Sequence, residues 1–156
     1  CLRPRTFLKG CTNYVNDLFG NPVSITEAAG TPQARTTTIT YGGPSSRQPV
    51  NIVTPRLTTA FTYDAQGNPL TRVQTDTSGG STNGQTRSWA FTYDATGHML
   101  TATNPLGAVT TYTYTNDNLA TVTNALGHVS RITSYNATGL PLSMTDPKEN
   151  DPAGVG

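Results

Sequence analysis

Aromatic and small polar residues alternate with a period of two along several short stretches of the chain. The aromatic members are Trp89, Phe91 and Tyr93, then Phe61 and Tyr63, and then Tyr112 and Tyr114. A period of two places successive side chains on opposite faces of a β-strand. The pattern therefore predicts strands with one aromatic face and one face of threonine, serine and alanine. At the last repeat the corresponding positions are Tyr135, Thr133 and Arg131, so we expect the aromatic stripe to weaken there.

One phrase recurs almost unchanged at residues 61–71 and 91–101. In both copies an aromatic strand is followed by Asp-Ala-x-Gly, and extended chain resumes at Leu-Thr. An aspartate in this position bonds the backbone N–H two residues on, and glycine permits the tight turn. A catalytic acid is needed once, whereas a turn is needed in every unit. We therefore interpret Asp64 and Asp94 as turn formers rather than as acids or calcium ligands.

Weaker copies extend the pattern over most of the chain. The first is residues 14–23, where Asn16 takes the tyrosine position, and others lie around Tyr41, Tyr114 and Tyr135. The unit is about 21 residues with insertions at turns, which is room for two strands of about six residues and two turns. It is too short for a crossover helix. The sequence predicts an all-β fold of serial antiparallel hairpins in one open, curved sheet of roughly eight to twelve strands.

Three parts follow from this organisation. We expect an irregular basic N-terminal end over 1–13 and repeats over 14–146, with tyrosine positions at 16, 41, 63, 93, 114 and 135. Residues 147–156 form a turn or tail, the truncated start of a next repeat. The chain begins at Cys1 without methionine and ends at Gly156 where no element finishes, so we interpret it as a piece of a longer polypeptide.

The composition excludes several classes of function. Charged residues make up 12% of the chain and the net charge is +1, so no basic stripe is available for nucleic acid. No apolar run approaches the roughly 18 residues of a membrane span. Cys1 and Cys11 are the only cysteines. They could pair in an oxidising compartment, but two unpaired thiols near a frayed end are the favoured interpretation.

No set of residues indicates catalysis or a cofactor. His98 and His128 lie in or beside turns, and neither has zinc-like spacing to the cysteines or to the other histidine. No Gly-x-Ser-x-Gly elbow, P-loop or His-Glu-x-x-His is present. We therefore expect solvated turn histidines, no cofactor, no metal and no enzymatic activity.

The repeated phrase identifies a family. Tyr-Asp-x-x-Gly-x-x-Leu-Thr, followed by Thr-Asn-Pro-Leu-Gly and a Thr-x-Tyr-x-Tyr strand, resembles the YD repeat of Rhs proteins over about residues 14–154. Two departures occur, since Tyr114 is followed by a shortened turn at 115–118 and Tyr135 is followed by Asn136. The structural repeat anchors expected from the motif are Tyr63, Asp64, Gly67, Leu70, Tyr93, Asp94, Gly97, Leu100, Gly107, Tyr114, Gly127, Tyr135 and Gly139.

The resemblance implies a function. Rhs proteins and the related toxin-complex B/C components wind their repeats into a spiralling β-sheet shell around a toxic C-terminal domain, and teneurins carry a similar barrel. It implies a non-enzymatic shell segment of a bacterial secreted or cell-surface protein used in competition between cells. Its expected partners are the remaining repeats of the same polypeptide and the enclosed toxin domain. The alternative is a surface module that binds carbohydrate or a receptor through its aromatic, threonine and asparagine side chains.

The C-terminal residues contain one further element. Asp151, Pro152 and Gly154 resemble the Asp-Pro-x-Gly-Leu element that the family uses in pairs for aspartate-based self-cleavage. A second such element is absent from this sequence. We favour an ordinary turn, like that at residues 104–107, over a cleavage site.

Overall fold

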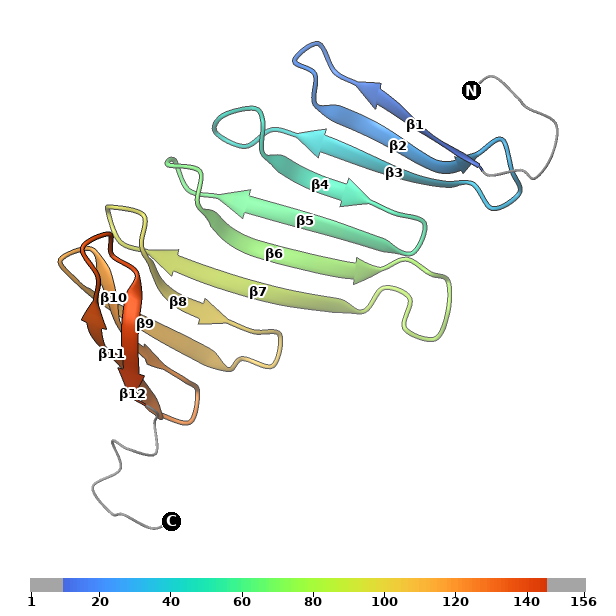
Figure 1. Cartoon of the computed structure of the whole chain (residues 1–156). Coiled ribbons are helices and arrows are strands. Elements are labelled where there is room, and N and C mark those ends of the chain that lie inside the picture. Colours follow the sequence, from blue (N-terminus) through green and yellow to red (C-terminus); the bar gives the residue numbers. More distant parts are fainter. Residues whose placement is uncertain (1–9, 146–156) are drawn as a thin grey trace. The chain divides into compact units, whose positions relative to one another are not determined.

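The computed structural model describes residues 10–145, and this part of the chain is all β with no helix. Its twelve strands form an antiparallel sheet whose strand order is the sequence order (Figure 1). The strands are β1 (Cys11–Asn16), β2 (Pro22–Ala29), β3 (Arg35–Tyr41), β4 (Pro49–Val53), β5 (Leu57–Tyr63), β6 (Pro69–Asp76), β7 (Thr86–Tyr93), β8 (Met99–Thr103), β9 (Val109–Thr115), β10 (Asn118–Thr123), β11 (Val129–Tyr135) and β12 (Pro141–Thr145). The predicted fold class of serial antiparallel hairpins is confirmed.

The chain divides into two compact units, Cys1–Ser88 and Trp89–Gly156. Within each unit a strand pairs with the strand that follows it in the sequence. We call the connections after odd-numbered strands intra-hairpin turns and those after even-numbered strands inter-hairpin turns. Because successive strands are antiparallel, the two kinds of turn lie at opposite ends of the strands.

In the hairpins that contain Tyr41, Tyr63 and Tyr93, the strand register shifts just before the tyrosine. In β5 and β6, Thr62 pairs with Thr71 but Tyr63 pairs with Pro69. The same shift precedes Tyr41 and Tyr93. A β-bulge of this kind bends the strand end and frees one backbone group from the ladder. The bulge therefore sets the tyrosine apart from the regular pairing of its strand.

A second bulge corrects one prediction about the faces. In β11 and β12, Ile132 pairs with Met144 and Ser134 with Ser143, which leaves Thr133 as an extra residue. The extra residue shifts the alternation by one. The aromatic face therefore continues as Ile132 and Tyr135, whereas Arg131 lies opposite Thr121 on the polar face. The expected alignment of Tyr135 with Thr133 and Arg131 is wrong, because it assumed an unbroken period of two.

The polar face carries pairs of hydroxyl groups across neighbouring strands. The Thr62 and Thr71 hydroxyls are 2.6 Å apart, as are those of Thr92 and Thr101. Thr113 and Thr121 repeat the arrangement at 2.7 Å. These pairs explain the use of threonine, which combines β propensity with a cross-strand hydrogen bond.

Each of the two units is a single sheet layer, and the described residues form no hydrophobic core. No apolar side chain in residues 10–145 is buried, and Thr59, 9% exposed, is the one buried polar residue there. A sheet normally buries one face against another layer. Cohesion in this layer instead comes from strand pairing, the turns and contacts between adjacent hairpins.

Candidate functional site

The repeated turn is held by the side chain of its first residue. In the β5–β6 turn, Asp64 Oδ1 accepts the backbone N–H groups of Gln66 at 3.0 Å and Asn68 at 2.8 Å. Its Oδ2 accepts the Asn68 side-chain N–H at 2.9 Å. Gly67 completes the turn with φ +92°, in the left-handed region that favours glycine. Both carboxylate oxygens are therefore occupied by the turn itself.

Five other turns use the same backbone bonds from an aspartate or asparagine oxygen to the residues two and four positions on. They start at Asp17, Asp94, Asn104, Asn124 and Asn136. These six turns include both intra-hairpin and inter-hairpin turns. The Thr-Asn-Pro-Leu-Gly segment at 103–107 and its copy at 123–127 therefore form the same turn as the Asp-x-x-Gly phrase. The signal that unites them is an aspartate or asparagine three residues before a glycine.

One intra-hairpin turn departs from this pattern. Between β9 and β10, Asn116 and Asp117 have φ values of 51° and 62°, and Asn118 pairs with Thr115. Two consecutive positive φ angles define a two-residue turn of the kind that asparagine and aspartate accommodate best. The shortened turn noted in the sequence is therefore tighter than its neighbours.

Three of the tyrosines that precede intra-hairpin turns link their hairpin to the preceding one. The Tyr63 hydroxyl donates to the Pro49 carbonyl at 2.7 Å, Tyr41 to Pro22 at 3.2 Å, and Tyr114 to Met99 at 3.0 Å. Each acceptor is the first residue of the second strand of the preceding hairpin. Burial raises the pKa of Tyr63 and of Tyr114, so both phenols remain donors at neutral pH. We call these bonds the tyrosine clamp.

Tyr135 lacks this bond. Its hydroxyl is buried and has no hydrogen-bond partner among the described residues. The residue that corresponds to the clamp acceptors by register is Leu119, which pairs with Tyr114 as Pro49 pairs with Tyr41. A register shift lies between Leu119 and Thr121, as it does beside the other acceptors Pro49 and Met99.

The other predicted anchors lie in the same two features. Tyr93 ends β7, Leu70 lies in β6 and Leu100 in β8. Gly97, Gly107, Gly127 and Gly139 all have positive φ, between 79° and 93°, at the fourth position of their turns. Asp151, Pro152 and Gly154 lie outside the described residues.

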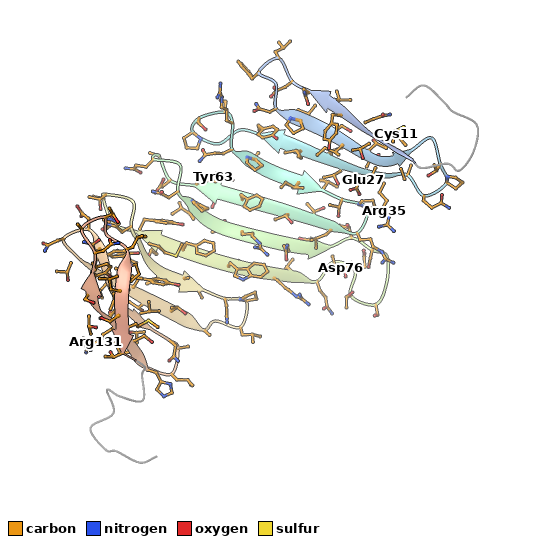
Figure 2. All side chains as sticks on the ribbon, viewed as in Figure 1. Cys11, Glu27, Arg35, Tyr63, Asp76 and Arg131 are labelled. Carbon is orange, nitrogen blue, oxygen red and sulfur yellow. The ribbon has the colours of Figure 1, made fainter. Side chains whose placement is uncertain are left out.

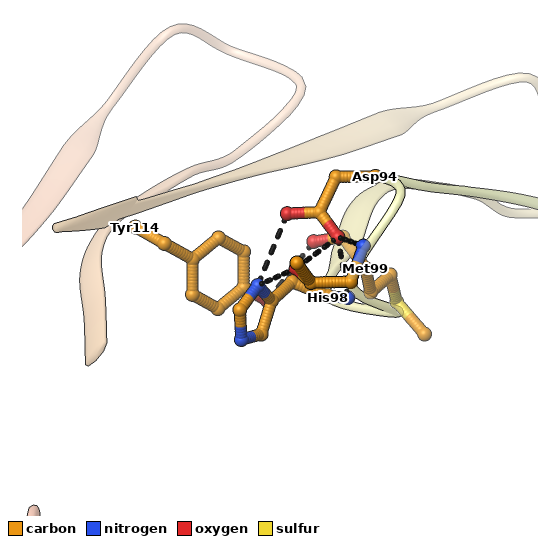
Figure 3. A network of polar contacts seen from close by, with 5 residues as sticks. Asp94, His98, Met99 and Tyr114 are labelled. Atoms are coloured by element: carbon orange, nitrogen blue, oxygen red, sulfur yellow. Dashed lines mark hydrogen bonds and ion pairs between the residues drawn. The ribbon is translucent and has the colours of Figure 1, made fainter. Parts of the chain in front are cut away.

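In the β7–β8 turn, His98 takes the position that Asn68 has in the β5–β6 turn (Figure 3). His98 Nδ1 lies 3.0 Å from Asp94 Oδ2 and 2.8 Å from Thr96 Oγ1, and its ring stacks on Tyr114 with centroids 4.5 Å apart. The expectation of a merely solvated side chain is wrong for His98. Asn68 donates a side-chain N–H in the same place, which assigns the proton to Nδ1.

The Asp94–His98 pair is not a catalytic dyad with Thr96 as nucleophile. In a triad the carboxylate and the hydroxyl bind different ring nitrogens. Here both oxygens approach the same nitrogen, Nδ1. Hydrogen bonds from the Thr96 hydroxyl and from backbone N–H groups hold the pKa of Asp94 well below its usual range. The network stabilises a turn and stacks it on the next hairpin.

Within residues 10–145, no three side chains of histidine, cysteine, aspartate or glutamate gather closely enough to hold a metal ion. No helix in that range is long and apolar enough to cross a membrane. Cys11 is disulfide-bonded, so the preference for two unpaired thiols is wrong. Cys1, the other cysteine of the sequence, lies outside the described residues.

The turn carboxylates predict a loss of stability in acid. Hydrogen bonds from Asn68 and from backbone N–H groups lower the pKa of Asp64, and equivalent bonds lower the pKa of Asp17 and Asp94. A depressed pKa in the folded state contributes stability above the unfolded value of about 3.9, and this is lost as the pH falls through the folded values. Urea unfolding followed by circular dichroism at pH 7 and pH 3 should show this loss.

Asparagine variants isolate the carboxylate from the turn. Asn104 and Asn124 already make the same backbone bonds, so Asp17→Asn, Asp64→Asn and Asp94→Asn combined should keep the fold and weaken the acid dependence. Asp76 should retain part of it, because hydrogen bonds from Ser78 and Thr82 lower its pKa to about 2. The reverse control, Asn104→Asp, should steepen the acid dependence. If the triple variant lost as much stability in acid as the parent, the turn carboxylates would not be the cause of that loss.

The single-layer sheet of hairpins, joined by one recurring turn and a tyrosine clamp, defines a β-repeat protein. A family model described as RHS Repeat matches residues 80–109 and 93–129. This part of the chain therefore carries Rhs repeats, in agreement with the resemblance of its Tyr-Asp-x-x-Gly phrases. Among curated proteins, no sequence matches significantly.

Solved structures with the same fold come from toxin complexes. The crystal structure of TcdB2-TccC3-Cdc42 matches with a TM-score of 0.68 at 15% identity, over 89% of this chain and 8% of that one. A structure of the Photorhabdus luminescens Tc holotoxin pore with a mutation in TccC3 gives 0.61 at 16% identity, over 88% and 8%. TcdB2-TccC3 without its hypervariable C-terminal region gives 0.60 at 16% identity, over 89% and 9%. The chain thus spans less than a tenth of each, and identities this low establish the fold alone.

Proposed function

We propose that this chain is a stretch of wall in an Rhs-type shell. In this proposal the shell belongs to a longer bacterial protein, secreted or displayed at the cell surface, and encloses a C-terminal toxin domain. The wall's partners are the remaining repeats of the same polypeptide and the enclosed domain. The wall itself catalyses nothing.

One observation carries the proposal. The described residues form a single layer with no buried hydrophobic side chain, although they include aromatic strands in regular register. A sheet of this kind cannot be an independent two-layer domain. It is suited to be one section of a continuous wall. In the solved structures with this fold, the matching segment makes up only 8% of the chain.

The side chains that looked chemically promising support a structural role. The turn carboxylates Asp64 and Asp94 are occupied by hydrogen bonds within their own turns. Tyr41, Tyr63 and Tyr114 direct their hydroxyls to backbone carbonyls of neighbouring hairpins. We therefore favour the wall over a surface module that would use the tyrosines to bind a receptor.

Limited proteolysis of the full-length polypeptide tests the proposal. The domain downstream of the repeats should be digested much more slowly in the full-length protein than when it is expressed alone. A variant with Tyr41, Tyr63 and Tyr114 all changed to phenylalanine weakens the clamp between hairpins and should speed the digestion of that domain. Equal digestion of the enclosed and isolated domains would overturn the enclosing function.

A further inference from the structure

A charged pocket lies on the aromatic face of the first unit, at the ends of the strands that carry the inter-hairpin turns. Its volume is about 580 Å³, and it is lined by Glu27, Arg35, Thr37, Thr54, Pro55 and Arg56. Glu27 and Arg35 are cross-strand partners in β2 and β3 (Figure 2). Three of its lining residues, Thr54, Pro55 and Arg56, form the β4–β5 inter-hairpin turn, and none belongs to the tyrosine clamp.

The pocket arises because the pairing of β3 with β4 stops short of the strand end that its pairing with β2 reaches. The β3–β4 pairing ends where Thr38 meets Val53, but the β2–β3 pairing continues to Glu27 and Arg35. The chain then reverses tightly, since Thr54 N–H donates to the Leu57 carbonyl at 2.9 Å and Leu57 N–H donates to Thr54 Oγ1 at 3.0 Å. On the side of β4, the segment of β3 from Arg35 to Thr37 therefore has no paired strand, although β2 still pairs with it on the other side. This gap beside β3 is the notch that forms the pocket.

The notch brings two guanidinium groups and one carboxylate together at its rim. Glu27 and Arg35 lie opposite each other on neighbouring strands, and both line the pocket together with Arg56. All three side chains are exposed, and the Arg56 charge also acts on Asp76 of the next hairpin, where it helps to lower the pKa of that carboxyl. The backbone of Arg56 is held by the next hairpin, because its carbonyl accepts the Thr77 N–H at 3.0 Å. One guanidinium is thus carried by a fixed turn.

The set of donors and acceptors indicates the chemistry of a ligand. Two guanidinium groups suit a carboxylate, which arginine binds through paired hydrogen bonds. The Glu27 carboxylate and the Thr37 hydroxyl would accept hydrogen bonds, so the same ligand should also carry donors such as hydroxyl groups. The volume lies in the range of small-molecule sites, roughly 300–1,000 Å³.

An added peptide strand fits this notch less well. Peptides usually dock on a sheet by pairing with a free strand edge. The strands β2, β3, β4 and β5 are each paired with their neighbours, so no free edge borders the pocket. A compact molecule that uses side-chain contacts alone is the better match.

We propose that this pocket binds an acidic sugar, with its carboxylate at Arg35 and Arg56 and its hydroxyls at Glu27 and Thr37. The site would give the outer or inner surface of the wall a selectivity for uronic-acid units. The proposal goes beyond the shell function and does not depend on it, because it concerns a notch within one unit.

Saturation-transfer NMR on the 156-residue chain tests the site with D-glucuronate as the probe. D-glucose is the matched neutral control, since it lacks only the carboxylate charge. Glucuronate should give a transfer signal that glucose does not. Arg35→Gln and Arg56→Gln should each weaken glucuronate binding about tenfold, the effect of losing one charge-assisted hydrogen bond. Glu27→Gln should keep the acid preference and weaken binding less.

Arg47→Gln is the control variant, because Arg47 is exposed in the β3–β4 turn and does not line the pocket. It should bind glucuronate as the parent does, and circular dichroism should show the same sheet content in all variants. Equal signals from glucose and glucuronate would overturn the proposal, as would equal losses in Arg47→Gln and Arg56→Gln. An acidic tripeptide that binds more tightly than glucuronate would overturn the choice of a sugar.

Discussion

Changing Tyr63 to phenylalanine is expected to lower the free energy of unfolding by about 1–2 kcal/mol, the cost of one lost hydrogen bond with its acceptor left unsatisfied. The hydroxyl donates to the Pro49 carbonyl at 2.7 Å and thereby joins the β5–β6 hairpin to the β3–β4 hairpin. Tyr63→Ala should cost more, because it also removes the ring that stacks on Phe61 with centroids 6.4 Å apart. Urea unfolding followed by circular dichroism measures both.

Tyr135 provides a matched control for the clamp. It occupies the same position in the β11–β12 hairpin, but its buried hydroxyl has no partner among the described residues. Tyr135→Phe removes an unsatisfied polar group and should leave stability unchanged or slightly raised. If Tyr63→Phe and Tyr135→Phe had the same effect, the hydrogen bond to Pro49 would not stabilise the hairpin junction.

Changing Gly67 to alanine is expected to destabilise the first unit by about 2–3 kcal/mol. The φ of +92° imposes strain of about 1–2 kcal/mol on a residue with a side chain. In addition, a Cβ at this position would lie 2.6 Å from Gln48 Nε2, which donates to the Gly67 carbonyl at 2.6 Å. Losing that bond between neighbouring intra-hairpin turns adds about 1 kcal/mol.

Gly107→Ala separates the two contributions. Gly107 has φ +80° in the same kind of turn, and a Cβ there would meet nothing within 4 Å. It should therefore show the backbone strain alone. Thermal and urea unfolding of both variants give the difference, and Gln48→Ala in the Gly67→Ala background should have little further effect. A larger loss in Gly107→Ala than in Gly67→Ala would contradict this account.

The local rules were predictable from the sequence because they repeat. The period of two identified the aromatic and threonine faces, and the spacing of Asp64 and Asp94 from their glycines identified the turns. Strand pairing between sequence neighbours follows from units too short to contain a crossover. These features depend on residues a few positions apart, so one sequence contains the information.

The contacts between hairpins were not predictable in this way. The acceptor of Tyr63 is a backbone carbonyl at Pro49, and a carbonyl has no sequence signature. The bulge at Thr133 moves Tyr135 back to the aromatic face without any glycine to mark it. The notch beside Arg35 depends on where β4 ends relative to β3, and strand ends are the least certain part of a sequence-based prediction.

The order of pairing also has a consequence for how such a protein is made. Every strand in each unit pairs with the strand synthesised just before or after it. Folding therefore requires no segment to wait for a distant partner, and low contact order of this kind favours rapid folding. Each hairpin can be added to the preceding one as the chain leaves the ribosome, and the tyrosine clamp then closes the junctions at Tyr41, Tyr63 and Tyr114.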